Sequence, residues 1–147
     1  LLKSLKYKGN YEIGVLLGSW YGHHLKNKIQ ADIILPVPIH QDKLKKRGYN
    51  QSTAIAEGIQ ASLDIPVDQS SVVRKKKTST QTKRHKVERW SAMKGVFEVV
   101  NPAELSGKEV LIVDDVITTG ATIFSLCETI NEHGPESIKV VSIATGK

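Results

Sequence analysis

Hydrophobic and polar positions form alternating blocks along the chain, and the most continuous apolar block lies in its C-terminal third. The aliphatic run Val110–Val113 predicts a strand that is buried on both faces, as in a parallel sheet. Apolar residues then recur at helical spacing and predict a helix. These residues are Ile123, Leu126, Cys127 and Ile130. We expect this helix to end near Gly134, which is followed by a proline.

Further apolar runs predict the other strands. They are Ile33–Leu35, the short segment Ser71–Arg74, Gly95–Val100 and a last buried strand, Ile138–Ile143. Because predicted strands alternate with predicted helices, the expected fold class is α/β, with a parallel sheet and flanking helices.

Two more helices are predicted upstream of the central strand. The first carries an apolar stripe that we expect to dock on the core. The stripe consists of Ile13, Leu16, Leu17, Trp20, Tyr21, His24 and Leu25. The second helix begins at Asn50 or Ser52, since either residue can cap it. Its apolar residues are Ile55, Gly58, Ile59 and Leu63.

Two basic segments lack such periodicity and are predicted to be loops. Pro36 and Pro38 break the first strand, and a stiff, shaped loop is expected over Gln41–Gln51. Its cations are Lys43, Lys45, Lys46 and Arg47. The second segment, Lys75–Lys94, predicts a long flexible basic loop. It is either a solvated linker or a lid that closes over a ligand and excludes water.

Composition places the chain in an ordinary globular class. With 147 residues, 39% hydrophobic and 24% charged, one domain is expected. No apolar stretch is long enough to span a membrane, so we expect a cytoplasmic protein without membrane contact. A single cysteine excludes an intramolecular disulfide. The net charge of +6 favours anionic partners, either polyphosphate substrates, nucleic acid or acidic surfaces. The chain does not begin with Met, which suggests a fragment.

The candidate chemistry lies between the central strand and the helix that follows it. Asp114 and Asp115 come at the carboxyl end of the strand, and the small, hydroxyl-rich turn 118–122 follows. Unpaired N–H groups at a helix start, threonine hydroxyls and a glycine suit a phosphate monoester. Two carboxylates beside that phosphate can accept hydrogen bonds from the vicinal diol of a ribose. The alternative is an ordinary strand–helix turn with a Thr cap and solvated acids; neither a P-loop nor a G-x-G-x-x-G motif is present.

The stretch Val110–Thr122 closely resembles the signature with which type I phosphoribosyltransferases bind phosphoribosyl pyrophosphate (PRPP). A second motif, Arg47–Gln51, resembles the Arg-Gly-(Phe/Tyr)-Asn-Gln element of the ComF family of competence proteins, which also carries the upstream Pro-Val-Pro of residues 36–38. Further matches to this family are Arg74, Thr78, Gln81 and Arg89. Trp90 and Ser91 depart from the family, which usually has another residue and Asn there, so the role of that Asn is unfilled; Trp90 either stacks on a base or packs.

The resemblance implies roles for named residues. Asp114 and Asp115 would hold the ribose hydroxyls and, through substrate or water, Mg²⁺. The 5-phosphate would be anchored by Thr118, Thr119, Gly120, Ala121 and Thr122. Further PRPP contacts would come from Pro38, Lys46 and Arg47. The catalytic set would be Asp114, Asp115, Arg47 and Arg74, of which the two arginines offset charge on the leaving pyrophosphate. Asp115 is also a candidate general base.

The resemblance also implies a fold and an activity. We expect a single phosphoribosyltransferase domain over 1–147 with the type I fold and without the four-cysteine zinc module with which ComF proteins commonly begin. The implied reaction transfers the phosphoribosyl group to a nitrogen nucleophile and releases pyrophosphate, with a link to DNA uptake. A purine, a pyrimidine, ammonia or another amine remains open as acceptor, and a homodimer is expected by analogy. The alternative is a non-catalytic competence module that retains the phosphate site and binds single-stranded DNA.

Overall fold

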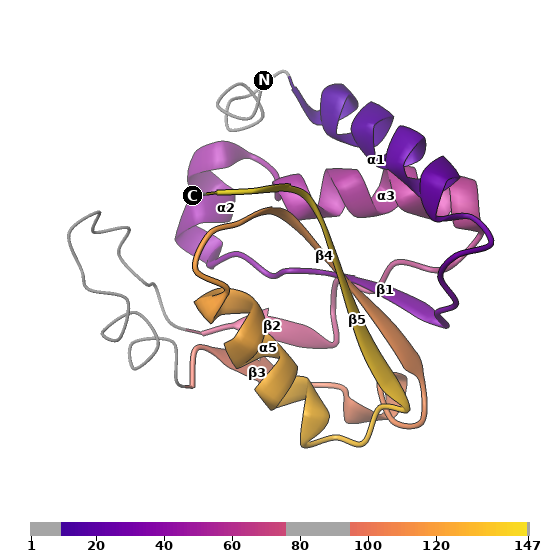
Figure 1. Cartoon of the computed structure of the whole chain (residues 1–147). Coiled ribbons are helices and arrows are strands. Elements are labelled where there is room, and N and C mark those ends of the chain that lie inside the picture. The colour runs from indigo at the N-terminus through magenta and orange to yellow at the C-terminus, as the bar shows by residue number, and fades with distance from the viewer. Residues whose placement is uncertain (1–9, 76–94, 147) are drawn as a thin grey trace.

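The computed structural model describes residues 10–75 and 95–146, and its centre is a parallel sheet (Figure 1). The strand order is β1 (Ile33–Pro36), β4 (Glu109–Ile117) and β5 (Ser137–Thr145), with β4 in the middle. A second, two-stranded sheet pairs β2 (Val72–Arg74) with β3 (Phe97–Val99) in the antiparallel sense. The predicted α/β class with a parallel central sheet is confirmed.

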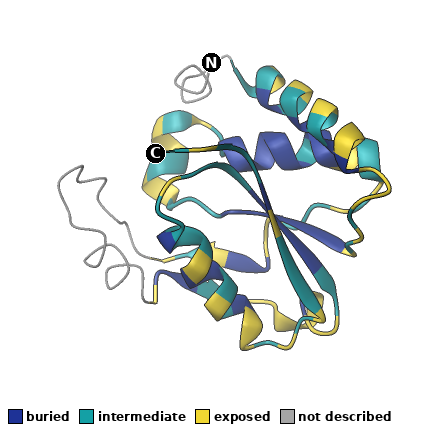
Figure 2. Ribbon diagram, in the orientation of Figure 1, coloured by how far each residue is buried: buried dark blue, intermediate teal, exposed yellow. Residues whose placement is uncertain are grey.

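Helices cover both faces of this sheet (Figure 1). Their bounds are α1 (Tyr11–Leu25), α2 (Gln41–Arg47), α3 (Gln51–Leu63) and α5 (Ala121–Asn131), and η2 (Pro102–Glu104) is a short 3₁₀ turn. Successive residues of a strand point to opposite faces, so the aliphatic run of β4 feeds two separate cores. Leu111 and Val113 pack with Ile59 of α3, whereas Val110 and Ile112 pack with residues of α5. Figure 2 shows this burial along β4 and the inner side of α3.

The first helix forms where it was predicted, but only part of the predicted apolar stripe is buried: Leu25 lies in the core and Tyr21 packs against it. Leu16 and Trp20 are 69% and 64% exposed. The buried positions are Gly14, Gly18, Gly22 and Leu25. A Cβ at Gly18 would lie 2.1 Å from the carbonyl oxygen of Ile55, so α1 and α3 touch backbone to backbone. This close approach decides the orientation of α1 and leaves Leu16 and Trp20 facing outward.

The first basic segment was predicted to be a loop over Gln41–Gln51. This prediction is wrong for most of the segment, because residues Gln41–Arg47 form α2. The His40 side chain accepts a hydrogen bond from the backbone N–H of Asp42 at the helix start. Gly48 ends the helix with a φ of 87°, a left-handed conformation that glycine adopts without steric cost. The basic last turn is favourable beside the negative end of the helix dipole.

Two predicted strands differ in extent or burial. β4 continues to Ile117, so Asp114 and Asp115 lie inside the strand rather than after it. The pairing of Ile117 with Thr145 of β5 explains this extension. β5 itself is not a buried strand, because it forms an edge of the described sheet and only Val141 in it is buried. The predicted helix after Asn50 and the short strand up to Arg74 are confirmed.

Two predictions concern features away from the sheet. Within 10–75 and 95–146, no helix combines the length and apolar character that crossing a membrane requires. Apart from Lys75, the predicted second basic loop lies outside the described residues. The same holds for five of its residues that were singled out in the sequence, Thr78, Gln81, Arg89, Trp90 and Ser91.

Candidate active site

The candidate site lies at the carboxyl edge of the parallel sheet, where ligands of open α/β folds usually bind. Asp114 and Asp115 are the sixth and seventh of the nine residues of β4, and Asp114 is level with Ser142 of β5. The turn 118–120 follows directly and leads into α5. The strand therefore places the two acids next to the turn 118–120, in the order of the sequence motif.

Ser52 of α3 fixes the Asp114 carboxylate. Its hydroxyl donates a hydrogen bond of 3.1 Å to Asp114 Oδ1, and the same oxygen accepts from the Asp115 backbone N–H at 2.9 Å. Ser52 is only 3% exposed. Asn50 caps the helix by accepting from the Ser52 N–H and donates its amide to the Val37 carbonyl oxygen at 2.9 Å. The start of α3 thus ties the end of β1 to the acids of β4.

Asp114 is electrostatically perturbed. Burial and then the negative charge of neighbouring Asp115 raise its pKa from 3.8 to about 7, although the hydrogen bonds from Asp115 N–H and Ser52 act in the opposite direction. Burial lowers the pKa of Arg74, and the negative charge of Asp114 works against that decrease. Arg74 therefore lies within electrostatic range of Asp114. Groups perturbed in this way concentrate at functional sites.

The turn after β4 forms a shallow hollow of about 40 Å³. Asp114 and residues 116–123 line it, and Asp115 does not. Gly120 is the N-cap of α5 and has a φ of 77°, and the N–H groups of the first helical turn have no carbonyl partner within the helix. The Thr119 hydroxyl accepts a long hydrogen bond, 3.4 Å, from the Ala121 N–H. All five predicted phosphate-binding residues, Thr118, Thr119, Gly120, Ala121 and Thr122, border this hollow.

A larger cavity of about 390 Å³ opens between α2, α3 and β2, and neither Asp114 nor Asp115 lines it. Pro38 and Arg74, two of the predicted site residues, line it. Tyr11 closes one wall, donates its hydroxyl to Glu57 and meets the Tyr49 ring edge-on at a centroid distance of 5.4 Å. Apolar groups with a few convergent polar ones are typical of small-molecule sites.

The remaining predicted cations, Lys46 and Arg47, lie on α2 and do not line either hollow. Lys46 is exposed. The Arg47 guanidinium donates to the Gln51 side-chain oxygen at 3.1 Å. The structure therefore brings Arg74 close to the acids and leaves Lys46 and Arg47 on the neighbouring helix.

Asp114 and Asp115 fit a hard cation only in part. Carboxylate oxygens suit Mg²⁺. In the described part of the chain, however, no three His, Cys, Asp or Glu side chains gather closely enough to hold a metal ion. Two carboxylates fit an ion whose other ligands are substrate oxygens and water, which is how Mg²⁺ is commonly held beside substrate phosphates.

Sequence reasoning missed the part that Ser52 plays in this site. The residue is 62 positions from Asp114, and its sequence context indicates only a helix start. A polar residue at a helix N-terminus predicts a cap, but it does not predict which distant side chain the hydroxyl will meet.

Comparisons with known proteins agree with this geometry. The family model described as "Phosphoribosyl transferase domain" matches residues 46–147. Competence protein F of Haemophilus influenzae is 34% identical over 123 residues, which are 83% of this chain and 52% of that protein. DNA utilization protein YhgH of Escherichia coli K12 is 30% identical over 146 residues, 95% of this chain and 63% of that protein. The chain thus spans less than two thirds of either relative.

Solved structures show the same fold. The glutamine PRPP amidotransferase of B. subtilis superposes with a TM-score of 0.62 and 20% identity over 90% of this chain and 26% of that one. The purine phosphoribosyltransferase of Pyrococcus horikoshii gives a TM-score of 0.53 and 20% identity over 90% of this chain and 73% of that one. With the family model covering most of the sequence, the chain belongs to the phosphoribosyl transferase domain family, and its relatives include competence proteins of the ComF type.

Proposed function

We propose that the carboxyl edge of the sheet binds PRPP and transfers its phosphoribosyl group to a nitrogen nucleophile. The observation that carries this proposal is the half-buried carboxylate pair of β4, with the perturbed Asp114 beside the turn that leads into α5. A ribose with a 5-phosphate has the matching chemistry, because its diol donates hydrogen bonds and its phosphate accepts them. The family match supports the same ligand.

In this proposal each end of PRPP meets a different part of the edge. The 5-phosphate occupies the hollow at residues 118–122, where backbone N–H groups and threonine hydroxyls donate to it. Asp114 and Asp115 accept from the ribose hydroxyls. Pyrophosphate extends toward the larger cavity, whose lining includes Pro38 and Arg74. Lys46 and Arg47 of α2 add positive charge on that side.

The chemistry needs no side-chain nucleophile. The bond from C1 of ribose to pyrophosphate oxygen breaks, the acceptor nitrogen forms the new bond at C1, and positive charge develops on the ribose ring between these events. The negative carboxylates lie beside the ring and stabilise its developing positive charge, while Arg74 stabilises the departing pyrophosphate. Asp115 takes a proton from the acceptor where the acceptor carries one.

Bound Mg²⁺ would neutralise charge on the pyrophosphate. Asp114 and Asp115 would hold it through substrate or water. The pKa of Asp114, raised to about 7 by burial and by Asp115, is consistent with a site that gains from nearby positive charge. The acceptor is not specified by these residues beyond its nucleophilic nitrogen.

Calorimetric titration of PRPP, with and without Mg²⁺, tests the proposal. The wild type is compared with an Asp114→Asn, Asp115→Asn double variant. We expect Mg²⁺-dependent binding to the wild type and at least about a hundredfold loss in the variant, because charged hydrogen bonds to two hydroxyls and the cation are removed. An Asp32→Asn variant at the opposite edge of the sheet is the control and should bind as the wild type does. Absence of binding to folded wild type would refute the proposal.

A second candidate function is binding of single-stranded DNA. It is favoured by the exposed Lys45 and Lys46 on α2 and by relatives named for competence and DNA utilization. Phosphate contacts release counterions, so such binding should weaken steeply as salt rises. Fluorescence anisotropy of labelled oligonucleotide, with Lys45→Ala, Lys46→Ala as the test variant, separates the functions. The lysine variant should lose DNA affinity, and Asp114→Asn should leave it unchanged or slightly higher.

A further inference from the structure

The last strand of the sheet contributes to the phosphate hollow through a contact that the sequence motif does not contain. The Gly146 N–H donates to the Ile117 carbonyl oxygen at 2.8 Å and extends the pairing of β5 with β4 to the edge of the turn. This places Gly146 beside Thr118, the first residue of the turn 118–120 and one of the residues that line the hollow.

The contact leaves no room for a side chain at position 146. A Cβ built on Gly146 would lie 2.8 Å from the Cγ2 methyl of Thr118, compared with 3.6 Å from its Cβ. Real carbon atoms do not approach so closely without a shift, because repulsion rises steeply below the optimal separation of about 3.5–4.0 Å. Since the methyl is the group that points at Gly146, the hydroxyl on the same carbon points in another direction.

We propose that Gly146 is a positioning residue for the phosphate hollow: its missing side chain lets Thr118 turn its methyl toward β5 and its hydroxyl toward the ligand phosphate. The inference rests on the proposed function for the identity of that ligand. A side chain at 146 forces Thr118 either to change its χ1 rotamer or to move away with its backbone, and both changes displace the hydroxyl. Gly146 itself does not touch the phosphate.

The inference is tested first without any ligand. Three-bond couplings from the Thr118 Cγ2 methyl to the backbone carbonyl carbon and nitrogen report χ1 in solution. We expect a single rotamer in the wild type and a different or averaged one in Gly146→Ala. If the Thr118 χ1 rotamer is already averaged in the wild type, the inference is overturned. This result needs the wild type alone and therefore holds even if Gly146→Ala does not fold. An unchanged rotamer in folded Gly146→Ala, together with an unchanged Gly146–Ile117 pairing, overturns it as well.

A double-variant cycle then connects the contact to PRPP. Titrations with Mg²⁺ and PRPP compare the effect of Gly146→Ala in two backgrounds, wild type and Thr118→Ser, which keeps the hydroxyl and lacks the methyl. In the wild-type background we expect affinity to fall about tenfold or more, the size of one charge-assisted hydrogen bond. In the Thr118→Ser background the same substitution should cost less than about twofold, because the clash is gone.

Each other result has a defined meaning. An equal loss in both backgrounds, or no loss in either, contradicts positioning through the Thr118 methyl. If folded wild type binds no PRPP, the proposed function fails, and the methyl couplings alone still decide whether Gly146 sets the Thr118 rotamer. The two failures are therefore distinguishable.

Discussion

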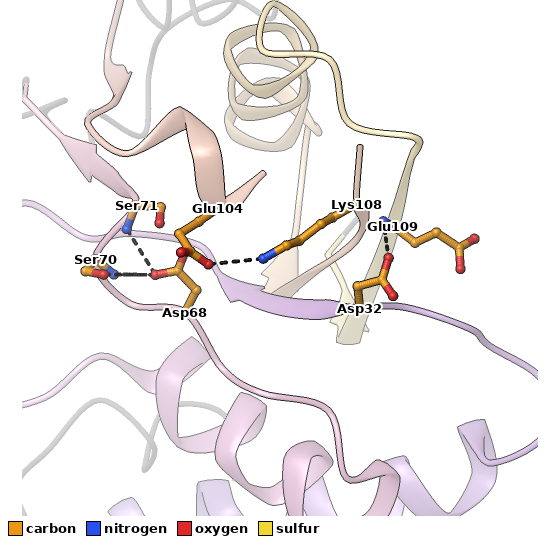
Figure 3. A network of polar contacts seen from close by, with 7 residues as sticks. All are labelled: Asp32, Asp68, Ser70, Ser71, Glu104, Lys108 and Glu109. Carbon is orange, nitrogen blue, oxygen red and sulfur yellow. Dashed lines mark hydrogen bonds and ion pairs between the residues drawn. The ribbon is translucent and has the colours of Figure 1, made fainter. Parts of the chain in front are cut away.

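Asp32 and Glu109 lie at the amino edge of the central sheet, and Asp114 and Asp115 lie at its carboxyl edge. At the amino edge, each carboxylate has donors close by: Asp32 accepts from the Glu109 N–H at 2.8 Å, and Glu109 accepts from Lys139 at 2.8 Å (Figure 3 shows the first pair). At the carboxyl edge, burial and the Asp115 charge raise the pKa of Asp114 to about 7. One edge is electrostatically satisfied, whereas the other is held in a state that an added cation or hydrogen-bond donor would relieve.

This difference separates residues that stabilise the fold from residues that are available for a ligand. Charges that are paired within the protein gain little from a bound molecule. A half-buried pair of like charges costs folding free energy, and binding of a ligand that brings positive charge and hydroxyl donors offsets this cost. Strong pKa perturbation by burial and a like charge is common at functional sites, which supports the proposed ligand site at the carboxyl edge.

Of the substitutions that test the difference between the two edges, Asp114→Asn is expected to change the free energy of unfolding most. The folded-state pKa of Asp114 lies above its ordinary value of 3.8, at about 7, so the folded protein binds the proton more tightly than the unfolded chain. Stability due to this group is thus present at low pH and lost as pH rises from about 4 to about 7. The Asn variant should be more stable than the wild type at pH 8 by on the order of 2 kcal/mol.

Urea denaturation at pH 5 and pH 8 measures this effect. The variant should lack the loss of stability that the wild type shows between the two values. Asp32→Asn serves as the matched control at the amino edge and should not be more stable at pH 8. A variant that is less stable than the wild type at pH 8 would show that the Asp114 carboxylate is a net stabiliser of the fold.

A smaller and opposite effect is expected from Asp68→Asn. Burial alone would raise the pKa of Asp68, but hydrogen bonds from Ser71 and Ser70 outweigh it and lower the pKa (Figure 3). Its stabilisation is therefore present above the ordinary pKa and lost as pH falls through the lower folded-state value. The variant should lose about 1 kcal/mol at pH 7, and the loss should shrink in acid. Thermal unfolding of both proteins from pH 7 down to pH 3 measures this difference in stability. A difference that grows as the pH falls would contradict the prediction.

The smallest effect is expected from Lys139→Ala. The Lys139–Glu109 pair at the amino edge is partly exposed, at 34% and 28% of the two side chains. Such pairs contribute about 0.5 kcal/mol and are screened by salt. Chemical denaturation in urea at low and at high ionic strength should give a small loss at low salt that disappears at high salt. A loss above about 2 kcal/mol would mean that this edge, too, depends on a strong buried charge interaction.

The sequence was sufficient for the parts of the fold that depend on local pattern. The aliphatic run of β4, the turn 118–120 and the periodicity of α5 identify the strand–turn–helix unit, and the cap at Asn50 marks α3. Signals for α2 were also present, since Gly48 and a basic last turn are typical of a helix end. The basic composition and the preceding prolines led to the prediction of a loop instead.

Other features depend on contacts that no local pattern contains. Hydrophobic periodicity placed Leu16 and Trp20 against the core, but the backbone contact at Gly18 allows only the glycine side of α1 to approach α3. The β4 strand reaches Ile117 because β5 pairs with it that far. The hydrogen bond from Ser52 to Asp114 joins residues 62 positions apart. Edge position, rather than composition, leaves most of β5 partly exposed.

The central claim is that PRPP binds at the carboxyl edge and not elsewhere on the chain. Backbone amide chemical shifts, followed while Mg²⁺ and PRPP are added to isotopically labelled protein, test it most directly. The account predicts that the largest changes fall on residues 114–122 and on Arg74, with none at Asp32, Glu109 or Lys139. Largest changes at the amino edge, or no saturable changes at all, would contradict it.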